Sequence, residues 1–326
     1  MPHMLSRPFG RLGWPVSEVG YGLWGMGGWS GSDDDESMAA IARAIDLGCT
    51  FYDTALAYGN GKSEQLLGRV LAARPGVRAG LRIATKVPPK NLTWPAVPEY
   101  PLDDVFPPDH IRSATETSLR NLDVPKVDLQ QLHVWTDAWA DDDRWIRAVD
   151  DLKSEGLIGG FGISINRWEP ASVLKALDTG VVDAVQVVYN IFDQHPEDEL
   201  FPRCREKGVA VIARVPFDEG SLTGTMRRGM TWPEGDWRNL YFTPDRLSDT
   251  LDRVDALVRD LPRDASLPDV ALRFILENPD VSTVIPGMRR IGHVDANVAA
   301  SGAAPLGSDL IGKLRHHRWT RTYVVS

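Results

Sequence analysis

The amino-acid sequence predicts a closed (β/α)8 barrel, in which eight parallel strands alternate with helices. Along 326 residues, apolar β-branched runs alternate eight times with segments of helical spacing, and such alternation is typical of a parallel sheet. Several of the runs are apolar throughout, as strands covered on both faces are. Their polar residues gather at the carboxyl ends, where the sites of such barrels lie.

The elements follow from hydrophobic spacing and from start and stop residues. The predicted strands, rich in Val and Ile, are residues 19–24, 50–53, 82–87, 127–134, 160–165, 182–190, 209–215 and 282–287. The predicted helices are residues 36–47, 63–71, 109–122, 142–155, 169–177, 197–207, 245–259, 268–277 and one from about residue 292. Gly48 is expected to end the first helix. Ser63 is expected to be the N-cap of the second.

Two long loops interrupt the pattern. Residues 88–108 are rich in Pro and are expected to lack regular structure, and residues 218–243 are rich in Gly and Trp. Long loops inside a compact domain are usually functional. An open, doubly wound sheet is the rival fold, but it needs a Gly-rich phosphate turn after an early strand. The glycines of residues 22–28 have the wrong spacing for that turn. Without repeats or a linker, residues 1–326 are predicted to form a single domain.

Composition narrows the class of protein. The chain is 43% hydrophobic and 25% charged, as ordinary globular proteins are. A net charge of −9 argues against a nucleic-acid partner, which requires a basic face. Two cysteines are too few for a disulfide scaffold, and no signal-peptide core or run long enough to span a membrane is present. We therefore expect a cytoplasmic protein, with a homo-oligomer left open.

Four polar residues follow predicted strands: Asp53, Tyr58, Lys86 and His133. Taken singly, Asp53 is best explained as a loop cap, Tyr58 as a half-buried aromatic, and His133 as a core histidine about as often as not. A purely structural role is harder to assign to Lys86, because an ammonium inside an apolar strand is unfavourable unless it is paired. Since all four stand at the ends of strands or just beyond them, we expect them to meet in one site.

The chemistry of this set points to carbonyl reduction. A Tyr phenol has an ordinary pKa of about 10, and a neighbouring ammonium is expected to lower that pKa and make Tyr58 a usable acid. Asp53 would hold Lys86, and His133 would orient a carbonyl oxygen. No protein side chain delivers hydride, so a nicotinamide cofactor must do so. A metal is not expected, because Asp53 and His133 are too few as ligands and Lys86 would repel a cation.

The motifs resemble those of the aldo-keto reductase family over residues 19–297. They are Asp53-Thr-Ala-x-x-Tyr58-Gly59, Gly61-x-Ser63-Glu64-x-x-Leu67-Gly68, Thr85-Lys86, Leu132-His133, Gly162-Ile-Ser164, Gln186-x-x-Tyr-Asn190 and Ile285-Pro-Gly287-x-Arg289. The resemblance implies a (β/α)8 barrel and reduction of an aldehyde or ketone by NADPH. It also implies that Tyr58 is the proton donor, supported by Lys86, Asp53 and His133.

The resemblance implies a cofactor site as well, with Ser164 and Gln186 on the nicotinamide carboxamide. The expected cofactor residues are Ser164, Asn166, Gln186, Arg214, Pro216, Leu222, Gly224, Gly287, Arg289, His293 and Asn297. Arg289 suits the 2′-phosphate of NADPH because its planar fork binds phosphate bidentately.

The chain departs from the family pattern at two of these places and at the position after Ser164. Ile165 follows Ser164 where a polar residue is common, and His293 stands where Gln is frequent. Arg214 stands where an aromatic ring usually stacks on the nicotinamide. Arg214 is expected either to lie flat on that ring or to pair with an acid of residues 218–219.

Trp24 and Trp135 are the expected substrate contacts, although tryptophans also pack loops. Because the tetrad is intact, we expect an enzyme. The alternative is a regulatory or redox-sensing protein that holds NADPH and turns over slowly, like the channel β-subunit members of the family.

Overall fold

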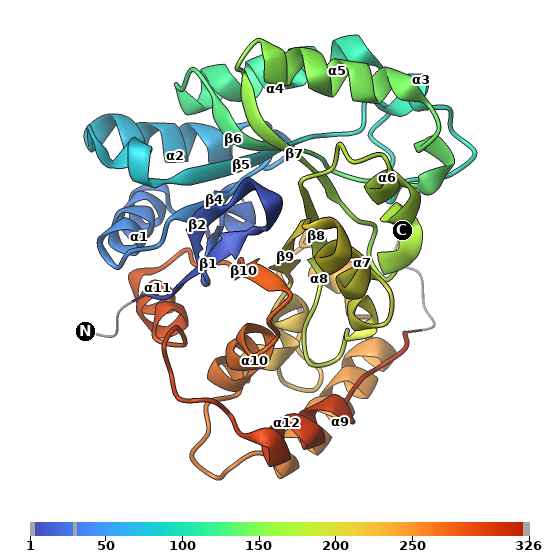
Figure 1. Cartoon of the computed structure of the whole chain (residues 1–326). Coiled ribbons are helices and arrows are strands. Elements are labelled where there is room, and N and C mark those ends of the chain that lie inside the picture. The colour runs from blue at the N-terminus through green and yellow to red at the C-terminus, as the bar shows by residue number, and fades with distance from the viewer. Residues whose placement is uncertain (1–3, 29–30, 322–326) are drawn as a thin grey trace.

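The computed structural model describes residues 4–28 and 31–321, and within them a sheet of eight parallel strands forms a barrel (Figure 1). The strands neighbour one another in chain order and are β3 (Tyr21–Gly22), β4 (Phe51–Asp53), β5 (Arg82–Val87), β6 (Val127–Leu132), β7 (Ile158–Ser164), β8 (Ala184–Val188), β9 (Ala210–Arg214) and β10 (Val281–Val284). Parallel bridges from Val19 to Val284 and from Gly22 to Gly287 join the first strand to the last. The predicted (β/α)8 barrel is confirmed.

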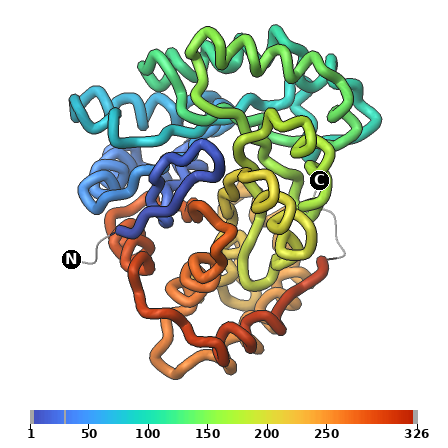
Figure 2. The backbone as a smooth tube through the Cα atoms, viewed as in Figure 1, coloured from blue at the N-terminus to red at the C-terminus, as the bar shows by residue number. Residues whose placement is uncertain are grey.

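Helices form the outer layer of the barrel (Figure 1). They are α1 (Asp34–Asp46), α2 (Lys62–Ala73), α4 (Pro108–Leu122), α5 (Asp143–Ser154), α6 (Leu174–Asp178), α7 (Leu200–Lys207), α9 (Pro244–Asp260), α10 (Leu267–Leu276), α11 (Ile291–Val298) and α12 (Ser308–Arg315). The first and last parts of the barrel wall lie next to each other, as the neighbouring blue and red segments in Figure 2 show. There Arg43 of α1 binds Asp295 of α11 at 2.8 Å. None of the helices within residues 4–28 and 31–321 has the length and apolar character needed to cross a bilayer.

Of the two residues predicted to mark helix ends, one is confirmed and one is wrong. Gly48 lies just beyond α1 with φ +87°, a conformation that suits glycine, and its predicted role is confirmed. The expectation for Ser63 is wrong, because Gly61 precedes α2 as its N-cap. The Ser63 hydroxyl lies 2.8 Å from Oγ1 of Thr54 and 3.1 Å from the carbonyl oxygen of Leu23. It therefore ties α2 to the loop after β4 instead of capping the helix.

An antiparallel hairpin precedes the barrel, and the sequence did not reveal it. Its strands are β1 (Ser6–Phe9) and β2 (Trp14–Ser17), in which Pro8 faces Pro15. Prolines weaken the sequence signal for a strand because they cannot donate to the ladder. The hairpin residues Phe9 and Val16 pack with Phe51, Ala84, Leu129, Ala184, Ala210 and Ile212 of the barrel strands. This cluster fills the interior, so the open end of the barrel is the one at the strand carboxyl ends.

The long loops contain short helices. Residues 88–108 were expected to lack regular structure, yet they include α3 (Leu102–Val105). Residues 218–243 include the 3₁₀ segment Asp218–Thr223 and α8 (Arg238–Tyr241). The helix expected at residues 169–177 is divided into a 3₁₀ turn, Pro170–Val173, and the short α6.

Candidate active site

The four predicted residues converge at the carboxyl end of the barrel. Asp53 is the last residue of β4, Lys86 lies in β5, and His133 follows β6 directly. Tyr58 stands in the turn after β4, where its backbone N–H donates to the carbonyl of Ala55 at 3.0 Å. Parallel strands end at one face of the barrel, so neighbouring strands deliver these side chains to the same place.

Lys86 is the centre of the cluster. Its Nζ donates to Oδ2 of Asp53 at 2.6 Å, to the carbonyl of Thr54 at 2.8 Å and to the hydroxyl oxygen of Tyr58 at 3.2 Å. The Lys86 side chain is 0% exposed and that of Asp53 is 2% exposed. Three acceptors match the three donors of an ammonium. Burial opposes the charge of Lys86, but Asp53 and Tyr58 outweigh it and raise the pKa of Lys86.

The second carboxylate oxygen of Asp53 accepts from two amides. Nε2 of Gln186 lies 2.7 Å from Oδ1 of Asp53, and Nε2 of Gln131 lies 3.2 Å from it. Gln186 was expected at the cofactor carboxamide, and it also belongs to the Asp53 network. Gln131 was missed, although an amide at a buried position of a strand was a signal. With these contacts both oxygens of Asp53 are engaged, which fixes the carboxylate and through it Lys86.

A further layer of polar contacts supports this cluster from behind. Glu64, at the start of α2, is buried and accepts from the hydroxyl of Thr85 at 2.5 Å and from Nδ2 of Asn121 at 2.8 Å. Burial raises the pKa of Glu64. Thr85 precedes Lys86 in β5, so Glu64 helps to fix the strand that carries the ammonium. The Ser63–Glu64 motif thus has a structural role.

The pKa of Tyr58 moves opposite to expectation. Burial raises the pKa of the phenol, and this effect outweighs the lowering by Lys86. Asp53 also raises it, because its negative charge lies beside the ammonium and offsets part of the Lys86 field. Tyr58 therefore keeps its proton at neutral pH. Lys86 still favours the phenolate once the proton has left.

His133 is held among aromatic rings and stays neutral. Its ring lies edge-to-face with Tyr58 at a centroid distance of 5.5 Å and with Trp94 at 4.6 Å. Burial, with the charges of Lys86 and Arg214, holds the pKa of His133 well below its ordinary value. Among the described residues, Nδ1 of His133 has no hydrogen-bond partner. A neutral imidazole can donate a hydrogen bond from one ring nitrogen and accept one at the other.

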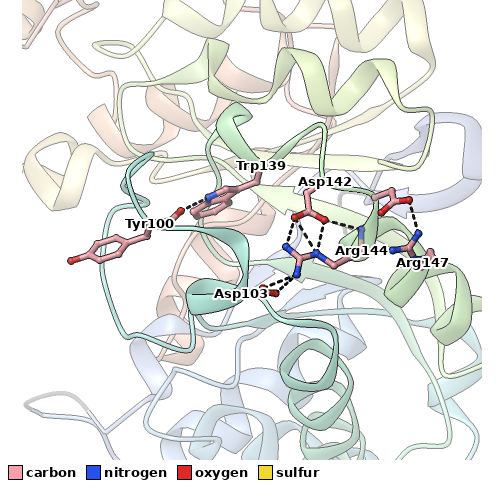
Figure 3. Close-up of polar contacts among 7 residues, drawn as sticks. Tyr100, Asp103, Trp139, Asp142, Arg144 and Arg147 are labelled. Atoms are coloured by element: carbon pink, nitrogen blue, oxygen red, sulfur yellow. Dashed lines mark hydrogen bonds and ion pairs between the residues drawn. The ribbon is translucent and has the colours of Figure 1, made fainter.

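Trp94 belongs to the loop of residues 88–108, which contacts the segment before α5 and the first turn of α5. Figure 3 shows the contacts: Nε1 of Trp139 donates to the carbonyl of Tyr100 at 2.8 Å, and Arg144 pairs with Asp103 at 2.6 Å. The ion pair is largely exposed and contributes little. The indole of Trp139 is buried, so its hydrogen bond is the firmer attachment of this loop.

A cavity of about 430 Å³ opens above the cluster. Its size is in the range of small-molecule sites. Nine of the residues expected at the active site, cofactor or substrate line it: Trp24, Asp53, Tyr58, Gln186, Arg214, Pro216, Gly287, Arg289 and His293. The cavity therefore reaches from the buried ion pair to the loop after β10.

The other expected residues are not part of the cavity lining: Lys86, His133, Ser164, Asn166, Leu222, Gly224, Asn297 and Trp135. Both polar atoms of Asn166 are engaged, with Oδ1 accepting from the N–H of Ala96 at 3.1 Å and Nδ2 donating to Glu169 at 3.0 Å. Trp135 is completely buried and packs edge-to-face on Trp139 and Trp145. Its position is that of a packing residue.

Arg214 reaches from the end of β9 across the cavity floor. Its Nη2 donates to the carbonyl of Ile165, after β7, at 2.9 Å. The expected pairing with residues 218–219 is not found, because Asp218 pairs with Arg321 and Glu219 pairs with Arg167. Burial, reinforced by Arg167, lowers the pKa of Arg214 to about 10. The guanidinium thus remains a cation whose full charge is disfavoured by its surroundings.

Positive charge also gathers at the other end of the cavity. Arg289 lies against Gly25, where an added Cβ would come within 3.0 Å of its Cδ. Burial, then the charges of Arg290 and Arg238, lowers the pKa of Arg289. Burial, then the charges of Arg290 and Arg289, lowers the pKa of His293. A cluster of like charges at the start of α11 favours an anionic ligand group.

Comparison with known proteins agrees with this geometry. The model of the aldo/keto reductase family matches residues 18–318. The chain is 28% identical over 310 residues to the NADH-specific methylglyoxal reductase of Escherichia coli (strain K12), covering 91% of this chain and 93% of that protein. It is also 28% identical over 317 residues to a probable voltage-gated potassium channel subunit beta of Oryza sativa subsp. japonica, covering 93% of both.

Solved structures are equally similar. The holo form of the aldo-keto reductase AKR11C1 from Bacillus halodurans matches with a TM-score of 0.78 and 29% sequence identity over 98% of both chains. Because the family match spans every strand of the barrel, and the relatives align almost end to end, this chain belongs to the aldo/keto reductase family and is an NAD(P)H-dependent oxidoreductase.

Proposed function

We propose that this enzyme reduces aldehyde or ketone carbonyls to alcohols with NADPH, and that Tyr58 is the proton donor. The observation that carries the proposal is the position of the buried Lys86 ammonium, 3.2 Å from the Tyr58 oxygen and 2.6 Å from Asp53, the two residues that line the cavity beside it. A phenol beside a fixed, buried cation can give up its proton while the negative charge that remains is stabilised.

The residues present fit a nicotinamide cofactor. Gln186, Arg214 and Pro216 line the cavity near Tyr58, while Gly287, Arg289 and His293 line its far part. An added Cβ at Gly287 would meet no atom within 4 Å, so the backbone borders open space there. We propose that Ser164 and Gln186 hold the carboxamide, that Leu222 and Gly224 lie along the chain of the cofactor, and that His293 and Asn297 hold the adenosine.

The preference for NADPH over NADH rests on Arg289 and its cationic neighbours. Arg290 and Arg238 are close enough to lower its pKa, so a phosphate placed there would relieve their mutual repulsion as well as form hydrogen bonds. The Escherichia coli relative is named as NADH-specific, which makes the choice of nucleotide a property to be measured on this chain.

The chain's own groups account for the proton and the orientation of the substrate. When bound, NADPH would supply the hydride to the carbonyl carbon. The neutral His133 would donate a hydrogen bond to the carbonyl oxygen, and Tyr58 would transfer its proton to that oxygen as negative charge develops. Lys86 would stabilise the phenolate, with Asp53 keeping the ammonium in place. Trp24 and Trp94, from two different loops, flank the region where the substrate would lie.

Replacement of Tyr58 by Phe tests the proposal. The loss of a general acid is expected to lower kcat by roughly 10²- to 10⁴-fold. NADPH binding, measured by fluorescence titration, should stay within a few-fold of wild type because the ring remains. Tyr100→Phe is the matched control, since that phenol lies on the outer loop and is 42% exposed. Near-wild-type turnover by Tyr58→Phe would remove Tyr58 from the role of donor.

The second candidate function is that of a regulatory protein that turns over slowly. It is supported by the similarity to the relative from Oryza sativa, which is named as a probable channel subunit. It predicts tight retention of NADPH together with negligible turnover across aldehydes and ketones of different size and charge. Steady turnover of even one carbonyl class at micromolar to millimolar KM would favour the reductase.

A further inference from the structure

The outer wall of the cavity comes from a part of the chain with its own small core. Residues 218–243, called the lid below, contribute Glu219, Gly220, Asp236, Trp237 and Arg238 to the cavity lining. Several apolar residues of the lid pack with the start of α9 in a cluster distinct from the two clusters of the barrel: Met226, Trp232, Tyr241, Phe242, Leu247 and Leu251. Leu222, near the beginning of the lid, belongs instead to the main core of the barrel. Beyond Leu222, the position of the lid depends on contacts with neighbouring loops, such as that of the small cluster with Trp168 after β7, and on polar contacts.

Residues 316–321, which follow α12, lie where those contacts are made. After α12, the N–H of Trp319 donates to the carbonyl of Phe192 at 2.8 Å, and the two rings lie edge-to-face at 6.0 Å. Phe192 belongs to the loop after β8. The guanidinium of Arg321 lies 4.5 Å from the ring centre of Trp319. Trp319 therefore fixes the tail to the barrel and presents Arg321 to the lid.

Arg321 joins three loops that are far apart in sequence. Its Nη1 donates to the hydroxyl of Tyr241 at 2.5 Å, and its Nη2 forms an ion pair with Asp218 and lies 3.4 Å from Asp193. Its guanidinium also lies 5.6 Å from the ring of Trp168, after β7. Tyr241 and Asp218 belong to the lid, whereas Asp193 belongs to the loop after β8. The side chains of Arg321 and Asp218 are both only 1% exposed.

The charges around Arg321 show why this contact matters. The carboxylates of Asp193, Asp218 and Glu219 are paired with two guanidiniums, those of Arg321 and Arg167. Burial and Asp218 raise the pKa of Asp193 to about 6, while Arg321 lowers it. Without Arg321, the carboxylates of the lid and of the β8 loop would repel one another across a desolvated contact. Such a contact is strongly unfavourable when one partner is removed.

We propose that Arg321 is a positioning residue that latches the lid over the cavity and thereby slows release of the cofactor. The effect on the cofactor rests on the proposed function, because it requires a nucleotide under the lid. The effect on the lid itself does not. Arg167 connects the lid to the cavity, since it lines the cavity, binds Glu219 of the lid and lies 5.1 Å from the ring of Tyr241.

The test compares Arg321→Gln with Arg318→Gln in the full-length protein. Arg318 lies three residues earlier, pairs with Asp198 at the surface, and loses the same charge when replaced. The first readout is amide hydrogen exchange of residues 218–243 without cofactor. Loss of a charge-assisted contact should speed exchange there by roughly tenfold or more in Arg321→Gln. Exchange in β4 and β5 and in the Arg318→Gln control should be unchanged. Equal lid exchange in both variants would overturn the latch.

The second readout is the rate of NADPH release, followed by stopped-flow fluorescence. Arg321→Gln should release NADPH roughly tenfold faster or more, with the single-turnover rate of carbonyl reduction unchanged, and Arg321→Lys should recover part of the slow release. If Arg321→Gln does not fold, Tyr241→Phe removes one acceptor of the same guanidinium and should give a few-fold faster release. Unchanged release from a variant whose lid exchanges faster would overturn the link to the cofactor. A wild-type protein that binds no NADPH would overturn the proposed function and leave the exchange result to decide the latch.

Discussion

The buried pair of Lys86 and Asp53 allows its structural and chemical roles to be separated. Lys86→Met keeps most of the length of the side chain but leaves the Asp53 carboxylate with only the amides of Gln131 and Gln186. Removing one partner of a buried pair costs about 3–5 kcal/mol. At about 2.1 cal/mol/K of unfolding entropy per residue, 326 residues give about 0.7 kcal/mol/K, so Tm should fall by about 4–7 °C.

The double variant Lys86→Met/Asp53→Asn removes both charges. Because no isolated charge is then left in the core, it should be more stable than the sum of the single variants predicts, by about 1 kcal/mol or more. Carbonyl reduction should remain roughly 10²- to 10⁴-fold below wild type, because the phenolate of Tyr58 has lost its cation. Urea unfolding and steady-state kinetics on the four proteins complete the cycle.

Lys62→Met is the matched control. Lys62 pairs with Asp34 at 2.8 Å, but the two side chains are 38% and 41% exposed. The same substitution there should change stability by less than about 1 kcal/mol and leave turnover intact. If the unfolding free energy of Lys86→Met lies within about 1 kcal/mol of that of Lys62→Met, the pair of Lys86 and Asp53 behaves as an exposed ion pair. That result would contradict the burial of this pair. If the double variant regains turnover, Lys86 does not act on Tyr58.

Three other outcomes are expected. Arg289→Ala should weaken NADPH roughly ten- to a hundredfold and leave NADH almost unchanged in fluorescence titrations, and equal losses for both would argue against a 2′-phosphate contact. The pKa of His133 is lowered in the folded state, so only the unfolded state binds a proton at this imidazole as pH falls below about 6.5. The free energy of unfolding should therefore decrease, as pH falls, by up to about 1.4 kcal/mol per pH unit. In urea unfolding, His133→Gln should lack this pH dependence. Arg214→Tyr should shift the ratio of dissociation constants in favour of NADP⁺ over NADPH, since a cation near the oxidised ring is removed; a constant ratio would show that Arg214 does not sense that ring.

Much of the barrel and the centre of the site could be deduced from the chain alone. Alternation of strands and helices is a local property, and parallel strands bring their carboxyl ends together whatever their side chains are. The register that pairs Asp53 with Ala84, two residues before Lys86, therefore follows from strands whose limits were visible in the sequence. The partner of a buried ammonium was also foreseeable, since an unpaired charge there would be too unfavourable.

Side-chain direction and net electrostatics were not foreseeable to the same extent. Trp135 follows His133 by two residues, yet it packs into the outer core on Trp145, because the chain leaves the strand at that point. The pKa of Tyr58 is raised although Lys86 lowers it, because the depth of burial decides which effect is larger. Burial is a sum over neighbours from the whole barrel, which no local pattern contains.

The attachment of the lid is the clearest case of a feature that tertiary structure decides. Arg321 and Asp218 are separated by 103 positions along the chain, and the sequence around each is that of an ordinary polar segment. They meet because α12 packs on α9 and carries the tail back across the barrel to the loop after β8. Spacing patterns can place residues on one helix or one strand, whereas a contact between a chain end and a distant loop exists only once the barrel between them has closed.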